Sequence, residues 1–163
     1  MAQLIAASEN SPKTLVEESF TAGLLHDVGK VVLLAEMPKE YREIFESRIP
    51  GRKNREQACL GCTHAEIGAY SMSIWGLPLP LVQAVAFHHW PSHAGETHFS
   101  SLTAVHAANA IVSASDPHPE NHETELDQDY LLSLGLQEHV PTWCNLNPPP
   151  PPPQTGQEPP AKV

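Results

Sequence analysis

The sequence has little positive charge and no long hydrophobic run. Nine Lys and Arg residues stand against 19 Asp and Glu, which gives a formal net charge of −10 with histidine counted as neutral. This balance argues against a general nucleic-acid binder, which needs basic side chains to face phosphate. Its apolar runs stay well short of the ~20 residues that cross a membrane, and no signal peptide opens the chain, so we expect no membrane association.

Cysteine is also scarce. Three cysteines are too few, and odd in number, for a disulfide scaffold, so a reduced cytoplasmic setting is expected. Cys59 and Cys62 have the spacing of a redox pair or of half a zinc site. Cys144 is the one remaining thiol, and no strand–helix pattern accompanies the pair. We favour incidental small residues over a redox or zinc site.

Proline is abundant and gathers at the C-terminal end. Six consecutive prolines, Pro148 to Pro153, lie in a segment with no apolar periodicity. We expect residues 1–146 to form one domain and residues 147–163 to be a disordered tail with polyproline II character. Docking of the proline run into an aromatic groove of a partner is the alternative.

The patterns before the tail predict an all-α helical bundle. Residues Thr63 to Glu66 match a capping box, Ser11 is a candidate N-cap before Pro12, and Pro50-Gly51 ends a helical pattern. The basic cluster at 52–55 follows this break, so we interpret it as an exposed loop, with a phosphate or acidic-partner contact as the alternative. The expected helices are residues 1–8, 12–26, 31–35, 41–48, 63–75, 80–90, 101–112 and 127–134.

Ten histidines are the unusual feature of the composition. His93, His98, His118, His122 and His139 lie in polar stretches and are expected on the surface. Others share a predicted helical face with apolar residues: His64 with Ile67, Tyr70 and Ile74; His88 with Leu81, Ala84 and Val85; and Asn109 with Leu102, Val105 and Val112. The pair His26-Asp27 follows an apolar helix. Because buried polar groups need partners or an ion, these residues predict either a hydrogen-bonded histidine core or a metal centre. Imidazole and carboxylate suit zinc, manganese, iron or nickel.

Five segments resemble a known family. FTAGLLHDVGK (20–30) resembles the motif of the HD superfamily of metal-dependent phosphohydrolases. With THAEIGAYSMSIWGLP (63–78), AVAFHHWP (84–91), LTAVHAANAIV (102–112) and YLLSLGLQEHVPTW (130–143), the chain is similar to the C-terminal half of the HDOD (HD-related output domain) branch. The resemblance implies metal ligands at His26, Asp27, His64, His88, His89 and Asn109. It also implies catalytic roles for Asp27 and for Lys30, which in catalytic relatives helps with substrate phosphate.

Three departures from catalytic relatives shape the expected function. No histidine precedes His26, Asn109 stands where those relatives have an aspartate ligand, and Trp90-Pro91 follows the paired histidines in place of a glutamate and a glycine-rich loop. The helical N-terminal half of such domains is also missing, which indicates a truncated chain, a fragment or a gene start placed too late. Apolar surface is then expected to be left for a partner or a second copy.

The favoured function is therefore a bacterial signalling output module that acts by protein–protein contact, with a vestigial divalent-metal site. Expected partners are signalling proteins, a receiver domain on the same full-length protein, or a second copy of the chain. The alternative is a metal-dependent phosphohydrolase acting on a nucleotide or cyclic dinucleotide. In that case His26, Asp27, His64, His88 and His89 would hold the metal.

Overall fold

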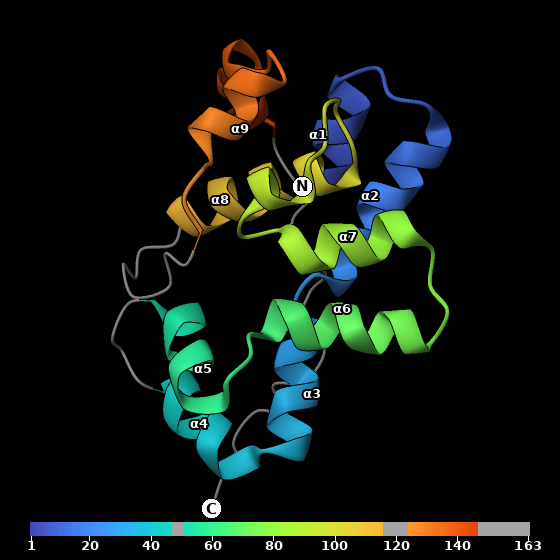
Figure 1. The fold of residues 1–163 in the computed structure, drawn as a ribbon. Coiled ribbons are helices and arrows are strands. Elements are labelled where there is room, and N and C mark those ends of the chain that lie inside the picture. The colour runs from blue at the N-terminus through green and yellow to red at the C-terminus, as the bar shows by residue number, and fades with distance from the viewer. Residues whose placement is uncertain (47–50, 116–123, 147–163) are drawn as a thin grey trace, which may run out of the picture.

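The computed structural model describes residues 1–46, 51–115 and 124–146, and in these residues every regular element is helical (Figure 1). This confirms the all-α prediction. The elements are α1 (Ala2–Ser8), α2 (Lys13–Leu25), α3 (Val28–Glu36), α4 (Pro38–Glu46), α5 (Arg52–Leu60), α6 (His64–Ile74), α7 (Leu79–Phe87), the 3-10 turn η1 (Pro91–Ala94), α8 (Ser101–Ala114), α9 (Gln128–Ser133), the 3-10 turn η3 (Gln137–His139) and α10 (Val140–Cys144).

The core lies between α1, α2, α7 and α8: α8 packs on the other three helices, and α2 also packs on α1 and α7. Helix α8 is central because eight of its first nine residues are buried. Small side chains such as Ala104 and Ala107 allow this close packing, and Leu102 fills the space between helices. Helix α6 extends the bundle by packing on both α3 and α7.

Two glycines set the approach of α3 to α6. A Cβ on Gly29 would lie 1.9 Å from the His64 carbonyl oxygen, and one on Gly68 would lie 3.1 Å from the Gly29 nitrogen. The backbones therefore touch at this crossing. The contact brings the first residues of α3 against the first turn of α6, where the candidate site begins.

Helices α4 and α5 extend away from the bundle at the lower left of Figure 1. Helix α4 packs on α3 and α5, with Tyr41 and Ile44 buried. The prediction of a loop at 52–55 is wrong because these residues form the start of α5. The N-cap of this helix is Gly51, which has a φ of 85°. Its sequence, RKNREQACL, is polar and lacks the apolar period that marks a helix.

The expected inward face of α6 is also wrong. Tyr70 and Ile74 are about two-thirds exposed, while Ala65, Ala69 and Met72 are buried. Side-chain size favoured the large residues as core, but the close crossing with α3 turns the face with Gly68 and the small residues Ala65 and Ala69 inward. The other apolar faces agree with the structure at Leu81, Ala84, Val85, Leu102 and Val105, whereas Val112 is 54% exposed.

Smaller differences concern helix ends. The capping box at Thr63 is present, with Glu66 bonded to the Thr63 backbone N–H. Ser11 makes no cap, because Pro12 occupies the N-cap position and α2 begins at Lys13. Helix α10 follows the helix that was expected to be the last.

Some predictions fall outside the described residues. The helix end at Arg48 and Pro50, the surface positions of His118 and His122, and the tail 147–163 belong to this group. Among the described residues, no helix is long and apolar enough to cross a membrane.

Candidate metal centre

The ends of four helices bring five predicted donors together. His26 caps the end of α2, Asp27 precedes α3, His64 begins α6, and His88 caps the end of α7 with His89 directly behind it. Donor atoms of His64, His88 and His89 lie within 4.8 Å of one another, as do those of His26, Asp27 and His88. Because His88 belongs to both groups, the five side chains form one cluster.

Each histidine of the cluster is held by the protein through Nδ1. His26 contacts the Gly23 carbonyl oxygen at 2.9 Å and His88 the Val85 carbonyl oxygen at 2.7 Å. His64 contacts Glu56 Oε2 and His89 contacts Thr124 Oγ1, each at 2.7 Å. The bond that one ring nitrogen makes sets the role of the other, so Nε2 is the nitrogen left to act as a ligand.

Three of the four Nε2 atoms, those of His26, His64 and His88, converge on Asp27. His64 Nε2 lies 3.3 Å from Asp27 Oδ1, His26 Nε2 lies 3.5 Å from Oδ2, and His88 Nε2 lies 4.0 Å from Oδ1. Lys30 Nζ donates to Oδ2 at 2.8 Å. The lysine predicted to meet a substrate phosphate thus contacts the carboxylate of the cluster.

Two buried atoms of the cluster have no hydrogen-bond partner. These are Asp27 Oδ1 and His88 Nε2, which face each other across 4.0 Å. Burying a lone pair without a partner costs free energy, so a cation between such atoms is favourable. Four imidazoles and one carboxylate match the preferences of zinc, manganese, iron and nickel. The residues present therefore fit a divalent metal ion.

The charge states agree with this donor set. Burial, with help from the charges of His26 and His64, lowers the pKa of His88 to about 3, so its ring is neutral and Nε2 is unprotonated. Burial together with the neighbouring histidines also lowers the pKa of His89. Although burial opposes it, the contacts with His64, His26 and Lys30 hold the pKa of Asp27 far below its ordinary value. A neutral imidazole and an ionised carboxylate are the forms that bind metal.

The pKa of His64 moves in the other direction. Burial opposes protonation, but the contacts with Asp27 and Glu56 raise the pKa of the ring above its ordinary value. Without a metal ion this site therefore attracts a proton, which is the smallest cation that can lie between the donors.

Three residues that support the cluster were not predicted from the sequence. Glu56 and Thr124 hold His64 and His89, and His106 contacts the His88 carbonyl oxygen at 2.8 Å while its Nε2 accepts the Asp127 backbone N–H at 2.9 Å. All three are buried, with at most 4% of their surface exposed. Glu56 could have been found only if the polar helix α5 had been recognised. Thr124 lies between the expected helices 101–112 and 127–134.

Asn109 is linked to His89 through Thr124. Its Nδ2 donates to Thr124 Oγ1 at 3.0 Å, and the same oxygen contacts His89 Nδ1. Asn109 is half-buried, which agrees with its place four residues after Val105 on the same face of α8. A metal-binding role for Asn109 stays a prediction.

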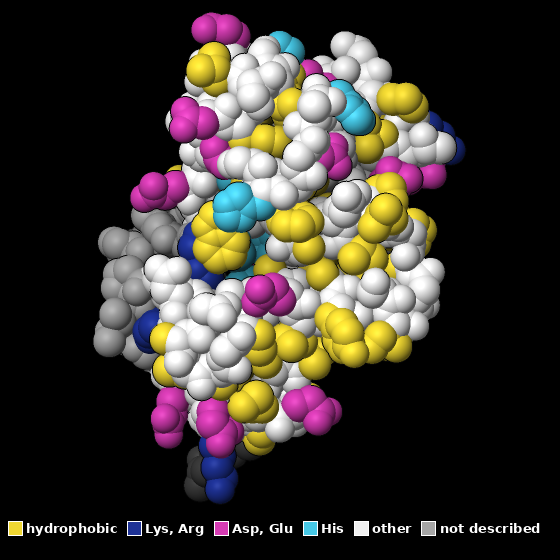
Figure 2. Space-filling view, in the orientation of Figure 1, with side chains coloured by type: hydrophobic (Ala, Val, Ile, Leu, Met, Phe, Trp, Pro, Cys, Tyr) yellow, Lys and Arg dark blue, Asp and Glu magenta, His cyan; other side chains and the backbone are white. Residues whose placement is uncertain are grey.

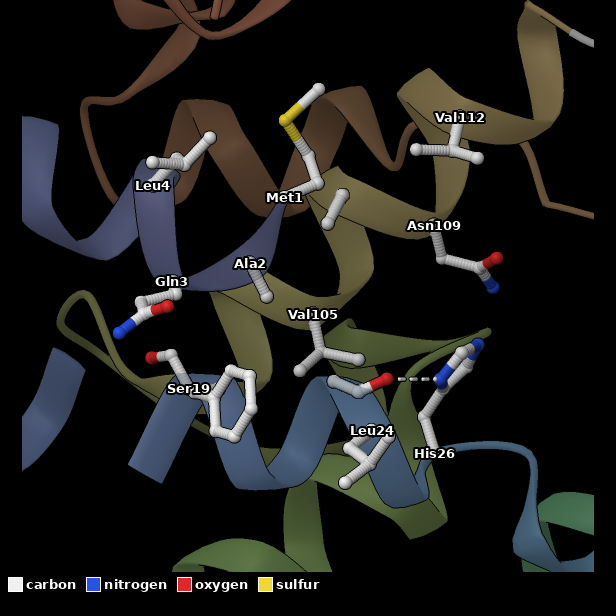
Figure 3. Close-up of a pocket in the computed structure, with 13 residues that line it drawn as sticks. Met1, Ala2, Gln3, Leu4, Ser19, Leu24, His26, Val105, Asn109 and Val112 are labelled. Carbon is white, nitrogen blue, oxygen red and sulfur yellow. Dashed lines mark hydrogen bonds between the residues drawn. The ribbon is translucent and has the colours of Figure 1, made fainter. Parts of the chain in front are cut away.

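A groove of about 460 Å³ reaches the edge of the cluster. It is lined mainly by apolar side chains of α1, α2 and α8, including Leu4, Phe20 and Leu24. His26 and Asn109 point into the same end of it (Figure 3). The polar centre therefore borders an open apolar surface.

The model of the HDOD domain family matches residues 1–91 of the 163. This segment contains all five donors of the cluster and exceeds half of the chain. The chain belongs to the HDOD domain family. An uncharacterized protein of Treponema pallidum (strain Nichols) is 30% identical to it over 115 residues, which are 68% of this chain and 22% of that protein. The chain thus spans about a fifth of the length of that relative. No solved structure is significantly similar to this HDOD chain.

The family match ends at the paired histidines and Trp90-Pro91. The similarity of 102–112 and 130–143 to the C-terminal part of an HDOD domain therefore stays a prediction. In the structure these segments form α8 and the α9–α10 region, and α8 packs on α2 and α7, the helices that end at His26-Asp27 and His88-His89. They are part of the same packed bundle as the matched residues.

Proposed function

We propose that this HDOD domain is the output module of a bacterial, cytoplasmic signalling protein. It acts by contact with another protein, and a divalent metal at the cluster of His26, Asp27, His64, His88 and His89 has a structural role. Family membership supports the signalling role. The metal is supported by the donor set and its two unpartnered atoms.

Exposed apolar side chains carry the protein-contact part of the proposal. Tyr70 and Ile74 on α6, Trp75 behind it and Leu79 on α7 are each 61–67% exposed. Figure 2 shows hydrophobic side chains gathered over α6 and α7. A soluble domain of this size rarely leaves so many large apolar groups in water unless a partner covers them.

The groove beside the cluster adds a second apolar surface. Leu24 is 71% exposed at its rim, and Val112 on α8 is 54% exposed. Leu24 and Val112 are aliphatic, and Phe20, which is 54% exposed, adds an aromatic side chain to the same surface. Contact with a partner at this groove would also reach His26, which lies at its end (Figure 3).

The alternative is a metal-dependent phosphohydrolase acting on a nucleotide or cyclic dinucleotide. The donor set favours it, because histidines and a carboxylate also hold catalytic metals, which stabilise charge on phosphoryl oxygens. Lys30 would steady the phosphate. Its contact with Asp27 at 2.8 Å gives it a second role within the cluster, as a fixed cation beside the carboxylate.

Site-specific crosslinking tests the contact surface. A photo-crosslinking amino acid at Ile74 or Leu79 should give a discrete crosslinked species in native cells, because both side chains lie in the exposed apolar surface. The same group at Lys39, an exposed residue of α4, is the matched control. Equal yields at all three positions would refute a contact at α6 and α7.

Turnover and metal content test the rest of the proposal. Protein loaded with manganese or iron should not hydrolyse phosphodiesters or nucleotides, whereas turnover that disappears in Asp27→Ala would establish the alternative. Metal content should fall in His64→Ala and in His88→Ala, and should not change in His98→Ala, which removes an exposed histidine. Unchanged metal in all three variants would remove the structural-metal part and leave the contact surface in place.

A further inference from the structure

We propose that Glu56 is a positioning residue of the metal centre. Its carboxylate holds His64 with the proton on Nδ1, so that Nε2 presents a lone pair to the ion. This inference rests on the metal part of the proposed function and is independent of the protein partner.

The geometry around Glu56 leaves its carboxylate fully engaged. The side chain is completely buried. Oε2 accepts the His64 backbone N–H at 2.9 Å and contacts His64 Nδ1 at 2.7 Å, and Oε1 accepts the Tyr41 hydroxyl at 3.0 Å. Glu56 thus holds both the first backbone N–H of α6 and the ring of the same residue. An isolated buried carboxylate would be costly, so these bonds explain why it is tolerated.

An ionised carboxylate accepts hydrogen bonds and cannot donate them. Oε2 of Glu56 accepts the His64 backbone N–H and Oε1 accepts the Tyr41 hydroxyl, so both carboxylate oxygens act as acceptors. At 2.7 Å, His64 Nδ1 must therefore carry the proton. A neutral ring protonated there has its lone pair on Nε2, and the adjacent negative charge increases the basicity of that nitrogen.

The contact between His64 and His89 shows why the lone pair on His64 Nε2 matters. Their Nε2 atoms are 3.0 Å apart, which requires a proton or a cation between them. Two imidazole nitrogens bound at ~2.0–2.1 Å to one ion would be about 2.8–3.4 Å apart in octahedral or tetrahedral geometry. The observed separation suits a pair of ligands. Glu56 supports one ring of the pair, and Thr124 supports the other.

Glu56 also joins the projecting helices to the cluster. Tyr41 belongs to α4, Glu56 to α5 and His64 to α6, so one carboxylate connects three elements. A second connection is the ammonium group of Lys53, which lies 4.6 Å from the centroid of the Trp90 ring. Filling the cluster should therefore stabilise α4 and α5 as well as the bundle.

The decisive variant is Glu56→Gln, which keeps the shape of the side chain and removes its charge. The control is Tyr41→Phe, which removes the bond to Oε1 and leaves both bonds from His64. Zinc affinity is measured by competition with a chromophoric chelator. The ring nitrogens of His64 are followed in metal-free, ¹⁵N-histidine-labelled protein by long-range ¹H–¹⁵N correlation at a pH where the ring is neutral. Far-UV circular dichroism establishes that each variant is folded.

We expect the wild-type ring of His64 to be protonated at Nδ1. We also expect Glu56→Gln to lower zinc affinity at least tenfold, within the 10–100-fold range typical of such supporting residues, and Tyr41→Phe to change it less than threefold. Should Glu56→Gln fail to fold, the wild-type spectrum alone decides, because a proton on Nε2 in place of Nδ1 overturns the proposal. A folded Glu56→Gln with wild-type affinity also overturns it. Wild-type protein that binds no zinc overturns it too, and leaves the contact surface of α6 and α7 unaffected.

Discussion

At the scale of single residues, a glycine allows α3 and α6 to approach closely enough to form the metal centre. Gly29 lies where α3 crosses α6, and a methyl group there would overlap the His64 carbonyl oxygen at 1.9 Å. We predict that Gly29→Ala lowers the free energy of unfolding by at least ~3 kcal/mol, the upper part of the range for overpacking, because backbone atoms must move. Urea unfolding followed by circular dichroism measures it.

The matched variant for Gly29→Ala is Gly68→Ala on the facing helix. Its new methyl group would meet its nearest neighbours at 3.1 Å, one of which is a movable Val85 methyl group, so a smaller cost of ~1 kcal/mol is expected. Equal costs for the two variants would mean that the helices separate easily at this crossing.

The sequence predicts most of the candidate donors and misses their supports. His26, Asp27, His64, His88 and His89 occur in recognisable motifs, and the structure gathers them into two groups of three donors that share His88. Glu56 and Thr124 have no motif of their own in a single sequence. Their roles depend on which ring nitrogen they face, and only the packing of α5 and of residues 124–127 on the cluster determines that.

At the scale of elements, Glu9 joins the two ends of the described chain. It follows α1, accepts the indole N–H of Trp143 at 2.8 Å, and contacts His139 Nδ1 at 2.9 Å. Trp143 is completely buried, so Glu9→Ala would leave a buried N–H unpaired. We predict a loss of about 1–3 kcal/mol in the free energy of unfolding, together with faster amide exchange in α10.

The control for Glu9→Ala is Glu17→Ala on the exposed side of α2. Glu17 makes a solvent-exposed pair with Lys13 at 3.5 Å, which should contribute little. Amide exchange of α10 measured by mass spectrometry should therefore change in the first variant only. Unchanged exchange in both would mean that packing of the Trp143 ring alone holds α10.

Helices with a strong apolar period or a cap were predictable, and those without were not. Helix α7 follows its pattern of Leu81, Ala84 and Val85, and α6 begins at its capping box. Helix α5 has no apolar period, and the buried side chain of Glu56 anchors it to the protein. The inward face of α6 could not be read from side-chain size, because its partner α3 approaches through glycine.

At the scale of the whole molecule, the buried histidines make stability depend on pH. His88, His89 and His106 all have a pKa below the ordinary value of 6.5, with burial as the main cause. Below pH 6.5 the unfolded chain binds protons at these rings that the folded protein does not bind. The free energy of unfolding of metal-free protein must therefore fall as the pH falls.

Between pH 6.5 and pH 5 these three rings dominate that change. The pKa of His64 is raised, so its contribution is already complete below 6.5 and stays constant. Asp27 and Glu56 have lowered pKa values, and their contributions are lost only as the pH falls below the ordinary values of 3.8 and 4.5. The pKa of His88 is about 3 in the folded protein. For this ring, the change from pH 6.5 to pH 5 corresponds to a loss of ~2 kcal/mol in the free energy of unfolding.

Urea unfolding in the presence of a chelator, at pH 6.5 and at pH 5, tests this dependence. Wild-type protein should lose at least ~2 kcal/mol over the interval, and His89 and His106 add to the loss. In His88→Asn the amide can still donate to the Val85 carbonyl oxygen, but it cannot titrate, so the loss should be smaller than in wild type by ~2 kcal/mol. His98→Asn removes an exposed histidine and should keep the wild-type dependence. If His88→Asn and wild type lose the same free energy, His88 is protonated in the folded protein, and its Nε2 is not the open donor that the cluster requires.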